Sequence, residues 1–300
     1  MGPFFSIVIP TYNRAAFVAD AVKSVLSQTY TDFEIIVVDD GSQDNTEEVI
    51  RLLNDPRLIY CKKINEERSI AKNYGIGKAS GTYINFLDSD DKFYPNHLEK
   101  GFELLAKNKF PEIGHLGYEI VKGNDVIARR NDLGENFHER ILQDNILHGN
   151  AIFIRRDIAL THQFLNNRNA FISEDWHLWL CLISRYNIYF DNTVTSVVND
   201  HAERSLKSID PDKLTECIEL IVADLKTDNA FKRKFGDKTA YFYADQYTFV
   251  ALLLSLNKRK MKVLKYLAKA FKEDITVLIR KRFLASVKYF LFPFLVKSRY

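Results

Sequence analysis

Short apolar runs alternate with segments of helical apolar spacing over the first third of the chain. Four runs are apolar enough to form buried strands, at residues 4–9, 33–38, 57–61 and 83–87. Between and after them, apolar residues recur three or four positions apart, which predicts helices near 17–28, 46–53 and 67–78 and another beginning near Pro95. Because the connections are short, we predict an α/β fold with a Rossmann-like, mostly parallel sheet flanked by helices.

Beyond residue 107 the pattern is less regular. Further strands are predicted at 112–121, 125–128, 151–154 and 194–198. Ser173 is positioned to cap a helix that runs through Ile183. From Pro211 onward the apolar spacing is helical. We therefore predict an α/β domain over residues 1–205 and a helical, basic C-terminal extension over 206–300.

Charge is distributed unevenly along the 300 residues, of which 46% are hydrophobic. Residues 258–300 contain 13 Lys and Arg residues against two acids, whereas the rest of the chain has eight more acids than bases. The basic segment also carries an apolar stripe at helical spacing from Leu264 to Ile279, and a later apolar run, residues 289–296, is too short to span a bilayer. This combination predicts contact with an anionic membrane surface and no nucleic-acid partner. The alternative is a helix that packs on its own domain or in a homodimer.

The three cysteines match neither a zinc site nor a disulfide framework. Residues 1–6 lack the basic start and long apolar core of a signal peptide. We therefore expect a cytoplasmic location, with peripheral attachment to the inner face of the membrane through the basic segment.

An acidic cluster follows the run at 83–87. Asp88 and Asp90 are two residues apart, so in an extended segment both side chains lie on one face and can converge on a hard cation. Mg²⁺ suits such a pair, because it takes one or two carboxylates and keeps its other positions for water and phosphates. The alternative is a solvated turn or the acidic cap of the helix near Pro95.

A second acidic pair, Glu174 and Asp175, lies at the start of the helix after Ser173. Carboxylates are favoured at a helix N-terminus, so the pair could simply stabilise the helix. His201 follows the strand predicted at 194–198, where a lone histidine is usually a polar surface residue.

Together these motifs resemble the inverting family 2 glycosyltransferases of the GT-A fold. The resemblance covers residues 4 to about 205 and is carried by four segments in one order: residues 6–13 (SIVIPTYN), 37–42 (VVDDGS), 81–91 with its DXD motif, and Glu174–Asp175. It implies a hexosyltransferase of polysaccharide biosynthesis. Such an enzyme moves a sugar from a nucleotide-sugar donor, by default a UDP-sugar, to a hydroxyl of a glycan or lipid-linked acceptor, with Mg²⁺ or Mn²⁺.

The resemblance also implies roles for individual residues. Donor binding is implied for Pro10, Thr11, Tyr12, Asp40, Lys72, Asp88 and Ser89. The metal would be held by Asp90, with Asp88 and His201 contributing. Asp175 would be the catalytic base, and Glu174 beside it would contact the acceptor.

Two departures from the family pattern concern the donor. The family usually has a glycine near Glu67, and it has an arginine where this chain has Lys72. Lysine keeps the charge but loses the planar fork of arginine. An inactive nucleotide-sugar-binding or scaffold protein stays open as an alternative. So does a sugar nucleotidyltransferase, although the first strand is followed by no glycine-rich phosphate loop. A receiver-like module fits poorly, because its first strand would end in acids.

Overall fold

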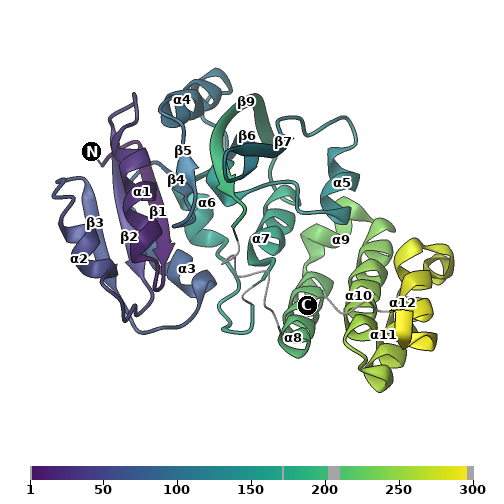
Figure 1. Ribbon diagram of the computed structural model, residues 1–300. Helices are drawn as coiled ribbons and strands as arrows, with labels where there is room; N and C mark the ends of the chain where they lie inside the picture. Colours follow the sequence, from purple (N-terminus) through teal and green to yellow (C-terminus); the bar gives the residue numbers. More distant parts are fainter. Residues whose placement is uncertain (1, 171, 202–209, 296–300) are drawn as a thin grey trace. The chain divides into compact units, whose positions relative to one another are not determined.

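A computed structural model describes residues 2–170, 172–201 and 210–295, and Figure 1 shows its elements. The chain divides into two units, the first being Met1–Ile141 with Asn145–Arg204 and the second Leu142–Asp144 with Ser205–Tyr300. The boundary predicted at residue 205 lies outside the described residues.

The first unit is built on one mixed sheet. Its strands are β1 (Phe5–Thr11), β2 (Phe33–Asp39), β3 (Leu58–Lys62), β4 (Tyr83–Phe86), β5 (Lys92–Phe93), β6 (Ile113–Lys122), β7 (Asp125–Arg130), β8 (Ile152–Arg155) and β9 (Ile188–Asn199). They are ordered β3-β2-β1-β4-β8-β6-β9-β5, with β7 paired to β6. The α/β class is confirmed.

Parallel pairing covers only part of this sheet. Strands β1 to β4 are mutually parallel, as predicted, and β6 is parallel to β9. The β4–β8, β6–β8, β6–β7 and β5–β9 pairs are antiparallel. The sheet is therefore mixed rather than mostly parallel, because the regular strand–helix alternation that enforces parallel pairing stops after α4.

Helices flank the sheet. They are α1 (Ala15–Leu26), α2 (Thr46–Arg51), α3 (Arg68–Lys78), α4 (His97–Lys107), α5 (Phe137–Gln143), η1 (Gly149–Ala151), α6 (Arg156–Thr161) and α7 (Glu174–Ile183). A Cβ atom added at Gly75 would lie 2.4 Å from Val8 Cγ1. Glycine therefore lets α3 lie close against β1, and this approach sets the position of the charged side chains at the start of α3.

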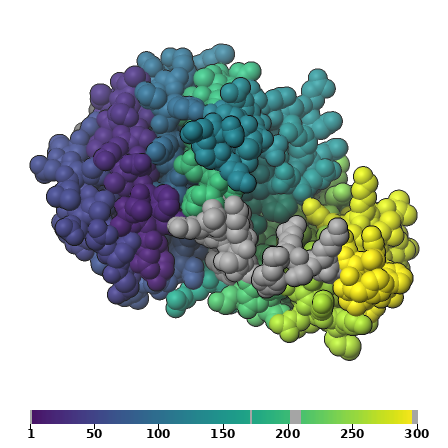
Figure 2. Space-filling model, viewed as in Figure 1, coloured from purple at the N-terminus to yellow at the C-terminus, as the bar shows by residue number. Residues whose placement is uncertain are grey.

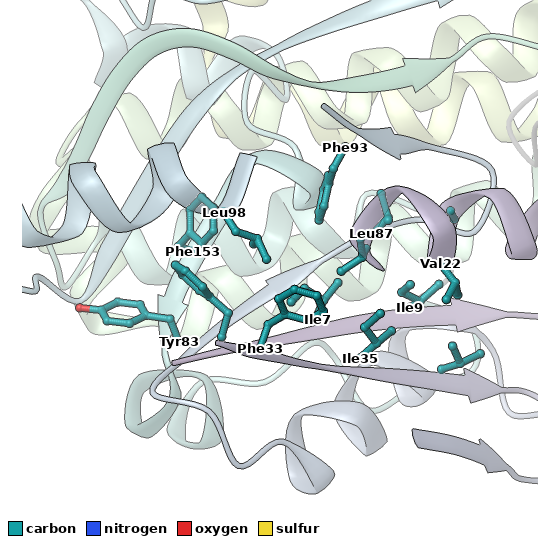
Figure 3. Close-up of a cluster of buried hydrophobic side chains, with 14 of the residues drawn as sticks. Ile7, Ile9, Val22, Phe33, Ile35, Tyr83, Leu87, Phe93, Leu98 and Phe153 are labelled. Carbon is teal, nitrogen blue, oxygen red and sulfur yellow. The ribbon is translucent and has the colours of Figure 1, made fainter. Parts of the chain in front are cut away.

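The core of the first unit lies between the sheet and its helices. Apolar residues of the strands pack with residues of α1 and α4 (Figure 3). They come from β1, β2, β4, β5 and β8, from the turn after β4 and from the two helices, and include Ile7, Ile9, Val22, Phe33, Ile35, Tyr83, Leu87, Phe93, Leu98 and Phe153. All are buried. This core holds the carboxyl ends of β1, β2 and β4 at one edge, where ligands bind in open α/β sheets.

Pro10 lies inside β1, so the prediction that the first strand ends there is wrong. The Val8 carbonyl oxygen accepts from the Leu87 amide. The backbone N–H and C=O groups of every second residue of β1, counted from Val8 and so including Pro10, therefore lie on the side of β4. The β1–β4 ladder stops at Val8 and Phe86, whereas the β1–β2 ladder continues to Thr11. The absent N–H of Pro10 therefore falls beyond the end of β4, where the ladder loses nothing.

The second unit is helical, as predicted. Its elements are α8 (Pro211–Thr227), α9 (Asn229–Phe235), α10 (Lys238–Leu256), α11 (Lys260–Glu273), η3 (Ile275–Ile279), α12 (Lys281–Leu291) and η4 (Pro293–Leu295). Helix α10 packs against α8, α9, α11 and α12 (Figure 1). In the described residues, no helix has both the length and the apolar character that crossing a bilayer requires.

The predicted apolar stripe of the basic segment is interrupted. Helix α11 ends at Glu273, and the Asp274 side chain accepts from the Thr276 amide at 2.9 Å to start the turn η3. Leu264 and Ile279 therefore lie in different elements. An aspartate cap inside a helical pattern explains the break, because such a cap begins a new helical segment.

Candidate functional site

The turn after β4 is anchored by its last acid. Asp91 is buried, and its carboxylate accepts from the Asn199 amide at 2.8 Å and from Asn150 Nδ2 at 2.7 Å. Burial, together with the neighbouring charges of Asp88 and Asp90, raises the pKa of Asp91 well above its usual value, against the opposing effect of these hydrogen bonds. Asp91 thus holds the turn in place. The turn is no helix cap, because α4 begins at His97 with Asn96 as its capping residue.

Asp90 and His201 are brought together as predicted. His201 Nε2 lies 2.8 Å from Asp90 Oδ2, and the imidazole ring stacks on Phe17 with centroids 5.2 Å apart. The Asn199 side chain donates to the Asp90 carbonyl oxygen at 2.5 Å. The end of β9 therefore fixes Asp90 through both side chain and backbone.

Asp88 lies in a different group of possible ligands. Its carboxylate, that of Asp91 and an imidazole nitrogen of His148 lie within 4.8 Å of one another. Both Asp91 oxygens already accept hydrogen bonds. The predicted metal residues are thus arranged in two groups. Asp90 and His201 form a pair, and the carboxylate of Asp88, two residues before Asp90, lies in the other group. Carboxylate oxygen and imidazole nitrogen form a donor set that suits Mn²⁺, and carboxylates alone suit Mg²⁺.

Two basic side chains of α3 converge on Glu174. Arg68 and Lys72 are four residues apart, so they lie one above the other on the same face of the helix. Glu174 is 2% exposed, and its Oε1 lies 2.9 Å from Arg68 Nε and 3.4 Å from Lys72 Nζ. Lys72 Nζ also lies 3.7 Å from Asp88 Oδ1. A chain of opposite charges therefore links the start of α7 to the acidic turn after β4.

This chain of charges keeps both cations protonated. The Glu174 carboxylate raises the pKa of Arg68 despite burial. Burial alone would lower the pKa of Lys72, but the carboxylates of Asp88 and Glu174 outweigh it and raise the pKa. The Lys72 ammonium also lies 5.2 Å from the centroid of the Phe164 ring. The predicted contact of Glu174 with an acceptor stays a prediction; in this structure its carboxylate is directed toward Arg68 and Lys72.

Asp175 differs from its neighbour. Its Oδ1 accepts from the Trp176 amide at 2.7 Å, and it forms no ion pair within the described part of the chain. Ser173 does not cap α7 as predicted: it has a positive φ of 56°, and its side chain makes no capping hydrogen bond. Asp175 supplies a carboxylate for the first turn of the helix instead, and its second oxygen stays available.

The loop after β1 offers different groups. Tyr12 is 46% exposed, whereas Thr11 is buried, and Thr11 Oγ1 has no hydrogen-bond partner among the described residues. The Thr11 carbonyl oxygen accepts from the Asp40 amide at 2.9 Å. A buried hydroxyl without a partner in the described residues is suited to form a hydrogen bond with a bound ligand.

Asp40 is directed at the segment that leads into α3. Its carboxylate accepts from Lys63 Nζ at 2.8 Å, from the Glu66 amide at 3.0 Å and from the Glu67 amide at 2.9 Å. It therefore shapes the loop that precedes Arg68. Contact between Asp40 and a nucleobase stays a prediction, as does the donor contact of Ser89, which is 8% exposed.

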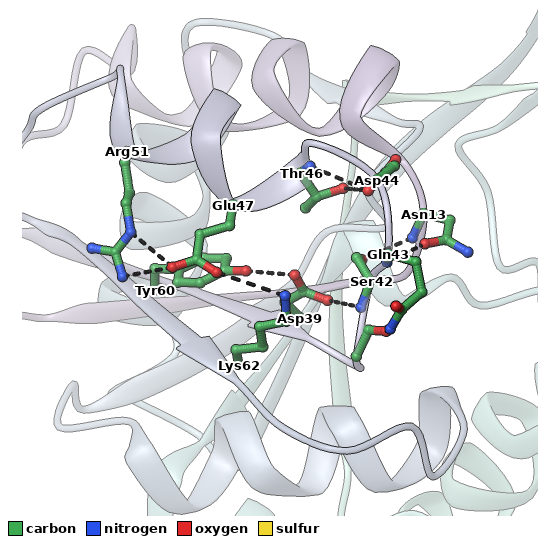
Figure 4. A network of polar contacts seen from close by, with 11 residues as sticks. Asn13, Asp39, Ser42, Gln43, Asp44, Thr46, Glu47, Arg51, Tyr60 and Lys62 are labelled. Carbon is green, nitrogen blue, oxygen red and sulfur yellow. Dashed lines mark hydrogen bonds and ion pairs between the residues drawn. The ribbon is translucent and has the colours of Figure 1, made fainter.

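A polar network supports the neighbouring loop (Figure 4). Asp39, at the end of β2, is buried and accepts from the Ser42 amide at 2.7 Å and from the Tyr60 hydroxyl at 2.5 Å. Burial and the adjacent Asp39 carboxylate raise the pKa of Tyr60, so it stays a hydrogen-bond donor. The backbone N–H of Asn13 donates to Ser42 Oγ at 2.9 Å, and this hydrogen bond joins the loops after β1 and β2.

Several residues of this site were not found by sequence reasoning. Arg68 could have been, because it lies one helical turn before Lys72. Asp91 lay within the acidic motif but received no role. Asn150 and Asn199 gave no signal, since their positions beside the turn depend on strand pairing between distant segments.

Comparison with known proteins matches residues 6–168 to the model of the family Glycosyl transferase family 2. The chain belongs to this family. An uncharacterized glycosyltransferase of Rickettsia bellii is 30% identical over 256 residues, which are 84% of this chain and 36% of that protein. The chain spans about a third of the length of this and two other Rickettsia relatives.

Two further comparisons are with a named glucosyltransferase and with a solved structure. The UDP-Glc:alpha-D-GlcNAc-diphosphoundecaprenol beta-1,3-glucosyltransferase WfgD of Escherichia coli is 29% identical over 185 residues, covering 61% of this chain and 71% of that protein. The structure of S. aureus TarS 1–349 in complex with UDP has a TM-score of 0.63 at 18% identity, and covers 91% of this chain and 90% of that one. The second similarity supports the GT-A-like fold.

Proposed function

We propose that this chain transfers a sugar from a nucleoside-diphosphate sugar to a hydroxyl group of a glycan or lipid-linked acceptor, by a single displacement that inverts the anomeric centre. The arrangement of Glu174 and Asp175 carries this proposal. Glu174 is buried between two cations, while Asp175 beside it has a carboxylate free of ion pairs among the described residues. Two adjacent acids thus have different environments, as division of roles between them requires.

Asp175 supplies the base in this proposal. A hydroxyl is a poor nucleophile, so a carboxylate must accept its proton as the oxygen attacks the anomeric carbon. Attack from the side opposite the leaving diphosphate inverts the configuration. The Trp176 amide, which donates to Asp175 Oδ1, fixes the side chain and leaves the other oxygen for the proton.

Arg68 and Lys72 would stabilise the departing diphosphate. Both are held near Asp88 by the chain of charges through Glu174. Preorganised cations stabilise negative charge that develops on a leaving group. Position 72 is a lysine where the family usually has an arginine, so it lacks the planar fork of a guanidinium. Arg68, one helical turn earlier, provides such a fork.

A divalent cation would be held by Asp90, with His201 and Asp88 nearby. Asp90 Oδ2 and His201 Nε2, 2.8 Å apart, provide mixed oxygen and nitrogen donors that fit Mn²⁺, and the Asp90 and Asp88 carboxylates alone fit Mg²⁺. When bound, such a cation neutralises phosphate charge. Asn199 and Phe17 keep Asp90 and His201 in position for it.

The donor and acceptor classes are proposed by analogy. The name of the E. coli relative gives UDP-glucose as donor and a diphosphoundecaprenol-linked sugar as acceptor. In this chain, the Thr11 hydroxyl has no hydrogen-bond partner among the described residues, and the Tyr12 ring is exposed. Both residues lie at the same sheet edge and would supply polar and stacking groups for a nucleoside. We therefore propose a UDP-sugar and a polyprenyl-linked acceptor.

The test measures UDP release from UDP-sugars in the presence of polyprenyl-diphosphate sugars and Mn²⁺. Asp175→Asn should lower turnover by roughly 10²- to 10⁴-fold while UDP affinity stays unchanged. Asp157→Asn is a matched control, because Asp157 also lies in the first turn of a helix of the same unit. Near-normal turnover of Asp175→Asn would exclude it as the base, and nucleotide binding without any release would favour a binding protein.

A further inference from the structure

Helix α12 has two chemically different faces. Ser286 is fully buried, its backbone carbonyl accepts from Ser255 Oγ at 3.0 Å, and its hydroxyl donates to the Thr248 carbonyl at 3.4 Å, so this face packs on α10. With about 3.6 residues per turn, Lys281, Leu284, Lys288 and Leu291 fall together on the opposite side. All four are exposed. The outer face of α12 therefore alternates leucine and lysine.

The turns at both ends of α12 add apolar side chains. Ile275 and Ile279 of η3 are 64% and 83% exposed, and Phe294 of η4 is 76% exposed. Both turns contact α12. Figure 2 shows residues of this segment, in yellow, on the visible surface of the molecule. Large side chains with this degree of exposure, grouped around one helix, mark a surface that meets an apolar phase.

The charges around this face that have no ion-pair partner among the described residues are all positive. Within residues 258–295 the two acids are both engaged, Glu273 with Lys226 and Asp274 with Arg280. Three further cations of the segment pair with acids elsewhere in the second unit: Lys262, Lys269 and Arg282. Lys281 and Lys288 form no ion pair among the described residues. Within the described part of the chain these two exposed lysines therefore lack counter-charges, and they complement an anionic surface.

We propose that the outer face of α12, with η3 and η4, lies on the surface of an anionic lipid bilayer. Leu284, Leu291, Ile279 and Phe294 enter the interface, and the ammonium groups of Lys281 and Lys288 extend to lipid phosphates. This geometry is monotopic, so no membrane-spanning helix is required. The inference concerns binding alone and does not depend on the proposed transfer reaction.

The test is flotation of the full chain with vesicles of phosphatidylcholine, with and without 30 mol% phosphatidylglycerol. The wild type should float with the anionic vesicles and less so at high salt. Because each basic residue near such a surface contributes about 1 kcal/mol, Lys281→Glu with Lys288→Glu should weaken binding by about 10- to 100-fold. Ile279→Gln with Phe294→Gln should weaken the binding that persists at high salt.

The matched control is Lys78→Glu with Lys107→Glu, which makes the same change in net charge on two exposed lysines of the first unit. It should float better than the α12 charge variant. All substituted side chains are exposed, and thermal melting checks that each variant folds. Equal flotation of wild type and α12 variants would overturn the proposal. So would absence of flotation combined with a dimer in light scattering that Ile279→Gln with Phe294→Gln dissociates, because a second copy would then cover this face.

Discussion

Arg68 Nε lies 2.9 Å from Glu174 Oε1, although the two residues are 106 positions apart in the sequence. Lys72, nearly fully buried, completes the contact from the next turn of α3. The first turns of α3 and the start of α7 are therefore joined through one buried carboxylate, and the base and the phosphate-binding cations of the proposed reaction depend on it.

Glu174→Ala should strongly destabilise the first unit. It leaves the Lys72 ammonium buried without its nearer carboxylate, and breaking a buried pair from one side typically costs about 3–5 kcal/mol. Urea unfolding measures the loss. Glu47→Ala is the control, because its pairs with Arg51 and Lys62 are exposed and should contribute about 0.5 kcal/mol or less. Similar losses for the two variants would show that the Glu174 cluster contributes little.

Asp90→Ala should remove metal-dependent nucleotide binding. In calorimetry with UDP and Mn²⁺, affinity should fall by about tenfold or more, because the cation loses its main carboxylate. With a chelator present, wild type and variant should bind equally. Asp20→Ala, an exposed acid of α1, should behave as wild type. Unchanged metal dependence in Asp90→Ala would place the cation elsewhere.

Glu67→Gly should stabilise the protein. Glu67 has φ 84° and ψ 159°, a conformation that only glycine adopts without strain. Relief of about 1–3 kcal/mol of strain exceeds the entropic cost of glycine, about 0.5–1 kcal/mol, so the free energy of unfolding should rise by about 1 kcal/mol. The control Glu66→Gly, at a residue without positive φ, should lower it. A loss of stability in Glu67→Gly would mean that its side chain compensates for the backbone.

Acid should destabilise the first unit through buried histidines. Burial, with the nearby His115, lowers the pKa of His97 to about 3, and burial likewise lowers the pKa of His115 to about 3. Unfolded histidine binds its proton near pH 6.5, so the unfolded state holds more protons below that pH. Stability is then lost as pH falls from about 6.5 toward 3, by up to about 1.4 kcal/mol per pH unit for each histidine.

His97→Gln removes one of the two histidines that bind a proton only on unfolding. Its slope of unfolding free energy against pH between 6 and 4 should be smaller than that of the wild type by about one proton. The exposed His138→Gln should leave the slope unchanged. Identical slopes for His97→Gln and wild type would show that His97 is protonated in the folded state.

Local sequence patterns predicted the parallel half of the sheet. Strands β1 to β4 and the helices between them follow directly from apolar periodicity, because each unit packs on its neighbour in sequence. The β8–β4 and β6–β8 pairings were not predicted, since they join distant segments without a turn between them. For the same reason Asn150, which anchors Asp91, could not be assigned.

The acidic motifs could be located in the sequence for a related reason, whereas the roles of their residues stay predictions. Asp88, Asp90 and Asp175 lie in short motifs next to strand or helix ends, and sequence fixes their neighbours. The burial and ion pairing of Glu174 could not be predicted, because they depend on contacts with Arg68 and Lys72 of α3, which are far away in the sequence. Nor could the backbone of Ser173 be predicted, because a serine before a helical segment usually caps it, whereas here the residue has a positive φ and its side chain makes no capping hydrogen bond.

The two asparagine clamps on Asp91 have a consequence for engineering. Asn150 and Asn199 fix the acidic turn from η1 and β9, whereas β7 and the loop after it make none of these hydrogen bonds. Residues 123–135 could therefore be exchanged for those of a relative without shifting Asp88 or Asp90. Chimeras made at these junctions would keep both hydrogen bonds to Asp91 intact, and a comparison of their acceptor choice would show whether residues 123–135 contribute to it.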